Sequence, residues 1–344
     1  MSSPLVLVTG ASGYLGAHCV KVLLDKGYRV RGTVRSLKNT KKIDPVKALD
    51  SSGTKIEFVE ADLTTKESWP KAVSGCDYVL HVASPFPLAG TQETIDTAIA
   101  GTKNVLEACA NENTLKKVVL TSSLVAIFEG HVDGRRLTEN DWSILNDKTD
   151  AYYTSKTLAE KAAWEFVEEH KNKFRFTVVN PGFIVGPTLT DELGSSAEVI
   201  KKLMEAPALP KMRFICVDVR DVAMAHIAAM ENQESDGMRI ICAEADSRLA
   251  SELFEKLTEE FESQGYCIPT RSIPDWIVKF GANFSDQFAK IAGRLGIELN
   301  FDNSRLREIL KIDPNDTRKA VVDMVYTMIE KGFIKKTTKY RGPK

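Results

Sequence analysis

Short apolar runs alternate with amphipathic stretches through the first half of this 344-residue chain. The apolar runs are rich in β-branched residues and predict strands at 5–8, 29–34, 56–59, 78–82, 117–120 and 176–179. Helical patterns lie between them, at 14–26, from about 66, at about 93–110 and around 152–164. Strict alternation of strand and helix is typical of an α/β fold with a parallel, doubly wound sheet that has helices on both faces.

The pattern changes after Asn180, where glycine and proline interrupt the chain as far as Pro210. A strand-like run, a helix and a further strand then return to the sheet, and the sequence from Arg248 onward is mostly helical and amphipathic. We therefore expect a sheet domain made of residues 1–180 and about 215–245, a smaller, mostly helical domain of about 181–214 and 246–335, and a flexible tail at 336–344.

A glycine-rich loop, Gly10-Ala11-Ser12-Gly13-Tyr14-Leu15-Gly16, joins the first predicted strand to the first predicted helix. Glycines allow a tight turn, close approach of the backbone to a pyrophosphate and close helix–strand packing. The helix N-terminus also offers free N–H groups to phosphates. An ordinary glycine-rich turn is the alternative, but the strand–turn–helix context favours a Rossmann-type dinucleotide site. In such a site we expect Gly10, Ser12, Gly13, Tyr14 and Leu15 to contact the cofactor.

The end of the second predicted strand indicates which dinucleotide is bound. An NAD site needs an acidic residue about 20 residues beyond the loop, yet no Asp or Glu occurs from Arg29, where the second predicted strand begins, until Asp44. Basic residues cluster there instead: Arg35, Lys38, Lys41 and Lys42. These cations suit a 2′-phosphate, so we expect NADPH or NADP+, with a solvated basic loop as the alternative.

The third and fourth predicted strands end in further candidate cofactor contacts. Asp62 is placed to accept a hydrogen bond from the adenine amino group while Leu63 packs on the ring, although a helix cap is the competing interpretation of Asp62. Val82, Ala83 and Ser84 are small enough to let a cofactor cross the sheet edge.

Three residues form a candidate catalytic set. Ser123 follows the fifth predicted strand, at the edge where open α/β sheets bind ligands. Tyr152 and Lys156 lie four residues apart on a predicted helix and therefore share a face. Lys156 would lower the pKa of the Tyr152 phenol and hold the ribose hydroxyls, so both residues count as cofactor contacts as well. Taken singly, a tyrosine and a lysine at this spacing are typical of a helix surface, and a serine here is typical of a turn. The order and placement of the three residues together favour proton transfer to a carbonyl that Ser123 polarises.

Together these motifs resemble those of the extended short-chain dehydrogenases/reductases: the Gly10 loop, Asp62-Leu63, His81-Val82-Ala83-Ser84-Pro85, Gly101-Thr102-Lys103-Asn104-Val105-Leu106, Thr121-Ser122-Ser123, Tyr152-x-x-x-Lys156 and Asn180-Pro181. Residues 155–164 are closely similar to the dihydroflavonol reductase branch. The resemblance implies that Arg35 and Lys42 hold the 2′-phosphate, that Ser123, Tyr152 and Lys156 are catalytic, and that Pro181 to Ile184 lie along the nicotinamide.

Two departures from that branch bear on the substrate. Phe128 stands where plant dihydroflavonol reductases often carry an asparagine that contacts the flavonoid, and the cinnamoyl-CoA reductase signature around the tyrosine is missing. An apolar wall of Phe86, Phe128 and Ile184 would suit a medium-sized aliphatic or aromatic ketone or aldehyde. The alternative is that these residues belong to the core.

Composition and charge restrict the partners. The formal net charge of -1 provides no basic field for nucleic acid or an anionic membrane. The six cysteines form no Cys-x-x-Cys pair and the five histidines have no metal-ligand spacing, so we expect reduced thiols, no metal and a cytoplasmic protein. We expect a monomer or homodimer acting on a small molecule.

The sequence thus predicts an NADPH-dependent carbonyl reductase, with two alternatives. An NAD-dependent epimerase or dehydratase of the same superfamily is disfavoured because Leu124-Val125 stands where dehydratases have an Asp-Glu pair. A non-catalytic NADPH-binding sensor would not need the intact set of Ser123, Tyr152 and Lys156.

Overall fold

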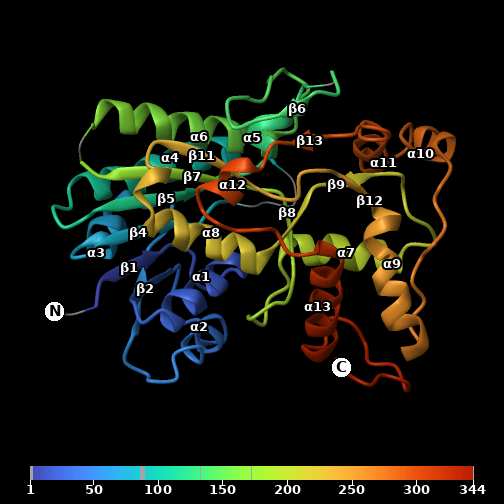
Figure 1. The fold of residues 1–344 in the computed structure, drawn as a ribbon, viewed down its shortest axis with the longest axis horizontal. Helices are drawn as coiled ribbons and strands as arrows, with labels where there is room; N and C mark the ends of the chain where they lie inside the picture. Colours follow the sequence, from blue (N-terminus) through green and yellow to red (C-terminus); the bar gives the residue numbers. More distant parts are fainter. Residues whose placement is uncertain (1–2, 86–89, 132, 172, 344) are drawn as a thin grey trace.

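A seven-stranded parallel sheet forms the core of the larger part of the protein, on the left of Figure 1. The computed structural model describes residues 3–85, 90–131, 133–171 and 173–343. The strands lie in the order β11-β7-β5-β4-β1-β2-β3. Their bounds are β1 Leu5–Val8, β2 Arg29–Val34, β3 Ile56–Glu60, β4 Tyr78–His81, β5 Lys117–Thr121, β7 Arg175–Pro181 and β11 Met238–Cys242. The predicted fold class is confirmed, because every neighbouring pair in this sheet is parallel.

Both faces of the sheet are covered, and the side chains of β1 illustrate the period of two. Val6 and Val8 pack with α1 (Tyr14–Asp25), α8 (Val219–Glu231) and α12 (Ser304–Glu308). Leu5 and Leu7 face the other layer, which contains α3 (Trp69–Val73), α4 (Gln92–Ala110) and α6 (Ala151–Glu169). Burial on both faces explains why the strands read as continuous apolar runs rather than as alternating ones.

A third apolar cluster lies beside the sheet, where the smaller domain was predicted. Its buried side chains come from α7 (Ser195–Glu205), α9 (Ala250–Phe261) and α13 (Thr317–Glu330). The helices α10 (Asp275–Gly281) and α11 (Asp286–Ala292) lie above them, at the upper right of Figure 1. The remaining α-helices and strands are α2 (Thr40–Lys47), α5 (Val125–Phe128) and the short strands β6 Arg136–Leu137, β8 Phe183–Val185, β9 Arg213–Phe214, β10 Cys216–Asp218, β12 Arg248–Leu249 and β13 Asn300–Phe301.

The strand-like run at 214–217 differs from the sequence prediction. It is divided between β9, which pairs with β12, and β10, which pairs with β8. Neither joins the main sheet, and only β11 returns to it in this part of the chain, beside β7. The parallel β8–β10 pair instead carries the backbone from the sheet edge toward the helical cluster.

The C-terminal segment is also different from the free tail that the sequence suggested. The Thr337 hydroxyl donates to the Gln264 carbonyl, and the Arg341 amide donates to the Gln264 side chain at 3.0 Å. The Tyr340 ring packs near Tyr266 and Tyr326. Aromatic packing and hydrogen bonds therefore hold this segment against α13 and the 3-10 helix that follows α9 (Glu262–Gln264), contacts that a charge-rich sequence without periodicity does not reveal.

Candidate active site

The three predicted catalytic side chains meet at the carboxyl edge of the sheet. Ser123 follows β5, and Tyr152 and Lys156 occupy the first turns of α6. Asp150 caps that helix, accepting a hydrogen bond from the Tyr152 amide at 2.9 Å, and so fixes where the first turn starts. Tyr152 makes a side-chain hydrogen bond with Ser123, and the Lys156 Nζ lies 6.0 Å from the centre of the Tyr152 ring.

Burial controls the protonation of this set. It raises the pKa of Tyr152 to about 12, against the lowering effect of the Ser123 hydrogen bond. It lowers the pKa of Lys156 to about 8, against the raising effect of the Glu160 charge. The expected lowering of the Tyr152 pKa by Lys156 is therefore not observed, because the desolvation of the phenolate outweighs the other effects. At neutral pH the pair is a phenol beside an ammonium.

The glycine loop has the backbone shape that a close phosphate contact needs. Gly10 has a φ of +66°, and a Cβ on Gly16 would lie 2.2 Å from the Gly10 carbonyl oxygen. Helix α1 starts at Tyr14, and its N-cap, Gly13, offers no side chain to its first N–H groups. This uncapped helix N-terminus fits a pyrophosphate, with the half-buried Ser12 beside it.

Two of the predicted loop contacts are available through their backbone only. The Leu15 side chain is buried in the core beneath the loop. The Tyr14 hydroxyl donates to the Gly186 carbonyl at 2.7 Å, so this side chain ties α1 to the segment after β8. Each residue can therefore offer a cofactor its amide but not its side chain.

The two predicted phosphate ligands differ in their surroundings. Arg35 is exposed directly after β2. Lys42 lies in α2, where its Nζ forms an ion pair with Glu192 at 2.6 Å. Both partners line an open pocket of about 890 Å³ between α2 and the segment that precedes α7. The sequence did not indicate this partner, which lies 150 residues further along the chain.

The ends of β3 and β4 are arranged only partly as expected. Asp62 accepts hydrogen bonds from the Thr64 amide at 2.9 Å and hydroxyl at 2.6 Å, which lower its pKa. Asp62 therefore closes a turn onto Thr64 and caps no helix, because the N-cap of the 3-10 helix that follows (Lys66–Ser68) is Thr65. The Asp62 side chain stays partly exposed. Leu63 and Val82 are half-buried against the two layers of the core.

A shared hydroxyl joins the end of β4 to the glycine loop. The Ala83 amide donates to the Thr9 Oγ1 at 2.9 Å, and the same hydroxyl bonds the His81 Nδ1 at 2.9 Å. Ala83 packs closely on the loop, since a Cβ on Gly10 would lie 3.2 Å from the Ala83 Cβ. Ser84 follows and is half-buried. These contacts with the end of β4 therefore fix the position of the glycine loop relative to the edge of the sheet.

The predicted apolar wall is only partly in place. Phe128 packs edge-on against Tyr153 and Phe301, with ring centres 5.9 and 6.4 Å apart, so at least one side of it belongs to the core. Ile184 is half-buried in β8, and Pro181 ends β7 with its carbonyl accepting from the Leu124 amide at 2.9 Å. Phe86 lies outside the described residues.

A buried polar cluster that the sequence did not predict lies behind the catalytic residues. Glu160, one turn after Lys156, bonds Ser122, Asn180 and Arg239 from three different strands or strand ends. The four-residue spacing from Lys156 is a signal that could have identified Glu160, but nothing in the sequence pairs it with Arg239, 79 positions away.

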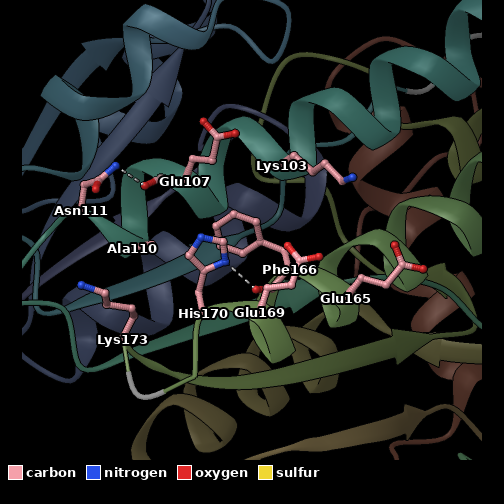
Figure 2. A pocket seen from close by; sticks show the side chains of 9 residues that line it. All are labelled: Lys103, Glu107, Ala110, Asn111, Glu165, Phe166, Glu169, His170 and Lys173. Carbon is pink, nitrogen blue, oxygen red and sulfur yellow. Dashed lines mark hydrogen bonds between the residues drawn. The ribbon is translucent and has the colours of Figure 1, made fainter.

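A second pocket, of about 400 Å³, lies between α4 and α6 at the ends of these helices opposite to the catalytic set (Figure 2). His170 stacks on Phe166 there, with ring centres 4.0 Å apart, and Lys103, Glu107 and Lys173 surround them. At 1.5 Å per residue, His170 lies roughly 27 Å along the helix direction from Tyr152. This pocket is therefore separate from the candidate active site.

Comparison with known proteins agrees with the motifs. Residues 6–242 match the model of the NAD dependent epimerase/dehydratase family. The chain belongs to this family. Cinnamoyl-CoA reductase CAD2 of Medicago truncatula is 40% identical over 248 residues, which cover 68% of this chain and 74% of the relative. Tetraketide alpha-pyrone reductase 1 of Arabidopsis thaliana is 34% identical over 342 residues, which cover 96% of both chains.

Solved structures resemble the whole chain. Gre2 of Candida albicans in complex with NADPH has a TM-score of 0.80 and 31% identity, covering 96% of this chain and 99% of its own. Yeast methylglyoxal/isovaleraldehyde reductase Gre2 complexed with NADPH also has a TM-score of 0.80, at 27% identity, covering 95% and 98%. The predicted identification as an extended, dihydroflavonol reductase-like member of the family and as an oxidoreductase is confirmed, and both NADPH complexes agree with the predicted cofactor.

Among the described residues, no helix is long and apolar enough to cross a membrane, and no group of His, Cys, Asp or Glu side chains could hold a metal ion.

Proposed function

We propose that this protein is an NADPH-dependent reductase that converts a ketone or aldehyde into an alcohol. One observation carries the proposal: Ser123, Tyr152 and Lys156 gather at the same sheet edge as the uncapped N-terminus of α1. The close approach of Gly10 and Gly16 leaves a cradle that a side chain would fill, which fits a dinucleotide. Arg35 and Lys42 would hold the 2′-phosphate, and the bound nicotinamide would supply a hydride.

The protein's own residues would then handle the proton and the developing charge. Ser123 would donate a hydrogen bond to the carbonyl oxygen as it gains negative charge. Tyr152 holds its proton at neutral pH, since burial raises its pKa to about 12, and would deliver it to that oxygen. The Lys156 ammonium would favour this transfer by stabilising the phenolate that forms. The half-buried Phe128 and Ile184 support a medium-sized, apolar substrate.

The decisive test replaces Tyr152 with Phe, which removes the proton donor but keeps the ring. Turnover of a responsive ketone or aldehyde should fall roughly 100-fold or more, since general acids contribute about 10²–10⁴. Binding of NADPH, measured by fluorescence, should stay near the wild-type value. Tyr153→Phe is the matched control, because Tyr153 is the next residue on the same helix, buried beside Phe128, and should keep its activity.

Retention of most of the activity by Tyr152→Phe would refute the proposed mechanism. Tightly held NAD that co-purifies with the protein would favour the epimerase or dehydratase alternative. NADPH binding without NADPH oxidation, across a panel of ketones, aldehydes, dihydroflavonols and steroids, would favour a sensor.

A further inference from the structure

Glu160 continues the face of α6 that carries the catalytic pair, one turn after Lys156. Its side chain is completely buried. Its carboxylate accepts hydrogen bonds from the Ser122 hydroxyl at 2.5 Å, the Asn180 amide at 2.8 Å and the Arg239 Nε at 2.6 Å. One carboxylate thereby joins α6 to the ends of β5 and β7 and to β11.

We propose that Glu160 is a positioning residue, which locks the strand end of Ser123 to the helix of Tyr152 and supplies the counter-charge of Lys156. The inference rests on the proposed function and adds to it a residue that would not touch the substrate.

The hydrogen bonds of Glu160 with Ser122 and Asn180 hold Ser123 from both sides. Ser122, the neighbouring residue, donates its hydroxyl to Glu160. Asn180 donates its side-chain amide both to Glu160 and to the Ser123 carbonyl, at 2.8 and 3.2 Å. A shift of α6 relative to β5 would therefore break hydrogen bonds on both sides of Ser123, so the cluster fixes the separation of Ser123 and Tyr152.

Arg239 is fixed independently of Glu160. Its guanidinium donates to the Glu139 and Asp141 carbonyls at 2.9 and 2.6 Å and lies 3.8 Å from the centre of the Trp142 ring. Buried ion pairs seldom add stability beyond that of apolar residues of similar volume. A gain in stability therefore does not by itself explain why Glu160 and Arg239 are charged. An anchored carboxylate would instead fix the position of the helix that carries Tyr152 and place a negative charge near Lys156.

The electrostatic consequence concerns Lys156. The titratable groups that face it are His81 from β4, which burial keeps neutral with a pKa of about 3, Tyr152 on the preceding turn and Glu160 on the next. Glu160 is the acid among them, and its charge opposes the desolvation that lowers the pKa of Lys156 to about 8. Removing this charge should lower that pKa further, because the desolvation of Lys156 then acts without the opposing carboxylate.

The test compares Glu160→Gln, which keeps the shape and removes the charge, with Glu165→Gln on the exposed face of the same helix. The pKa of Lys156 is read from its 13Cε NMR signal in lysine-labelled protein, which is assigned by its loss in Lys156→Met. Glu160→Gln should lower this pKa by roughly one unit, whereas Glu165→Gln should leave it unchanged. An unchanged pKa in Glu160→Gln would overturn the counter-charge role.

The positioning role has its own variant, Ser122→Ala, which removes one hydrogen bond and leaves the ion pair. It should lower kcat roughly tenfold, as loss of one positioning hydrogen bond can, without moving the alkaline limb of the pH profile, whereas Glu160→Gln should move that limb to lower pH. A wild-type kcat in Ser122→Ala would refute the positioning role of Glu160.

Two further outcomes separate the possible failures. If Glu160→Gln does not give a folded protein by circular dichroism, Glu160→Asp keeps the charge on a shorter side chain. It should preserve the Lys156 pKa and lower kcat, and the opposite pattern would refute the proposal. A wild-type protein that reduces no carbonyl, yet shows the Lys156 shift in Glu160→Gln, would refute the proposed function but not the counter-charge.

Discussion

The ion pair between Lys42 and Glu192 predicts that the protein itself opposes the binding of the phosphorylated cofactor. Lys42 is the proposed ligand of the 2′-phosphate, and its Nζ lies 2.6 Å from a Glu192 carboxylate oxygen. Glu192 lies between β8 and α7, in the segment next to Gly194, whose backbone packs on the Tyr14 ring. Two anions would therefore compete for one ammonium, and the substitution Glu192→Gln removes one competitor.

The magnitude follows from the exposure of the pair. The side chains of Lys42 and Glu192 are 32% and 49% exposed, so solvent screens their attraction. Exposed ion pairs contribute about 0.2–1 kcal/mol. Since about 1.4 kcal/mol is a factor of ten, Glu192→Gln should tighten NADPH binding by about 1.4- to 5-fold.

The reverse change, Lys42→Ala, should weaken NADPH binding. A hydrogen bond to a charged group contributes about 1.5–3 kcal/mol, from which the 0.2–1 kcal/mol of the Glu192 pair is subtracted. The net loss of about 0.5–2.8 kcal/mol corresponds to about 2- to 100-fold weaker binding. Lys47→Ala, on the exposed last turn of the same helix, is the matched control.

The assay is the dissociation constant of NADPH and of NADH, measured by fluorescence titration at low and moderate salt. NADH has no 2′-phosphate, so both substitutions should leave its affinity unchanged. The gain in Glu192→Gln should diminish at higher salt, because exposed charges are screened. Equal effects on NADPH and NADH would refute the reasoning and place Lys42 away from the phosphate.

Two further predictions concern the backbone of the glycine loop and a buried lysine at the start of β5. Gly16→Ala should abolish NADPH binding, since its Cβ would lie 2.2 Å from the Gly10 carbonyl oxygen, whereas Gly293→Ala, where the nearest atom is 3.6 Å away, should bind NADPH normally. Lys117→Met should lower the free energy of unfolding by about 1–3 kcal/mol, because it removes the 2.5 Å ion pair with Asp236 and the Nζ that donates to the Asn232 carbonyl, while Arg175 remains 3.6 Å from Asp236. Urea denaturation measures this loss, and an unchanged midpoint at equal slope would contradict it.

The sequence was sufficient for the features that depend on local patterns. Parallel strands that are buried on both faces have uninterrupted apolar sequences. The glycine loop is a contiguous motif whose glycine spacing specifies its backbone conformation. The Tyr152–Lys156 pair follows from helical geometry alone, and Ser123 from the rule that parallel strands end at one edge. Each of these features depends on residues close in sequence or on a general property of the sheet.

The features that the sequence did not reveal depend on partners distant in sequence or on side-chain direction. Glu192 and Arg239 pair with Lys42 and Glu160 across 150 and 79 positions, and no spacing rule connects such residues. Asp62 could face a ligand or cap its own turn, and the choice depends on a rotamer that bonds Thr64. A motif therefore places a residue at the site but does not determine the direction of its side chain.

The helical spacing that predicted the catalytic pair also explains why Lys156, rather than Tyr152, makes the activity depend on pH near neutrality. Positions 152, 156 and 160 place a phenol, an ammonium and a carboxylate on successive turns of one face. Burial moves the pKa of the phenol up to about 12, far from neutrality, and that of the ammonium down to about 8. The ammonium is thus the group whose charge changes near physiological pH. A lysine with a depressed pKa is charged below that pKa and neutral above it, so reduction should decline as the pH rises through about 8. The charge of Glu160, one turn further along α6, raises the pKa of Lys156 and so moves this decline in activity to higher pH.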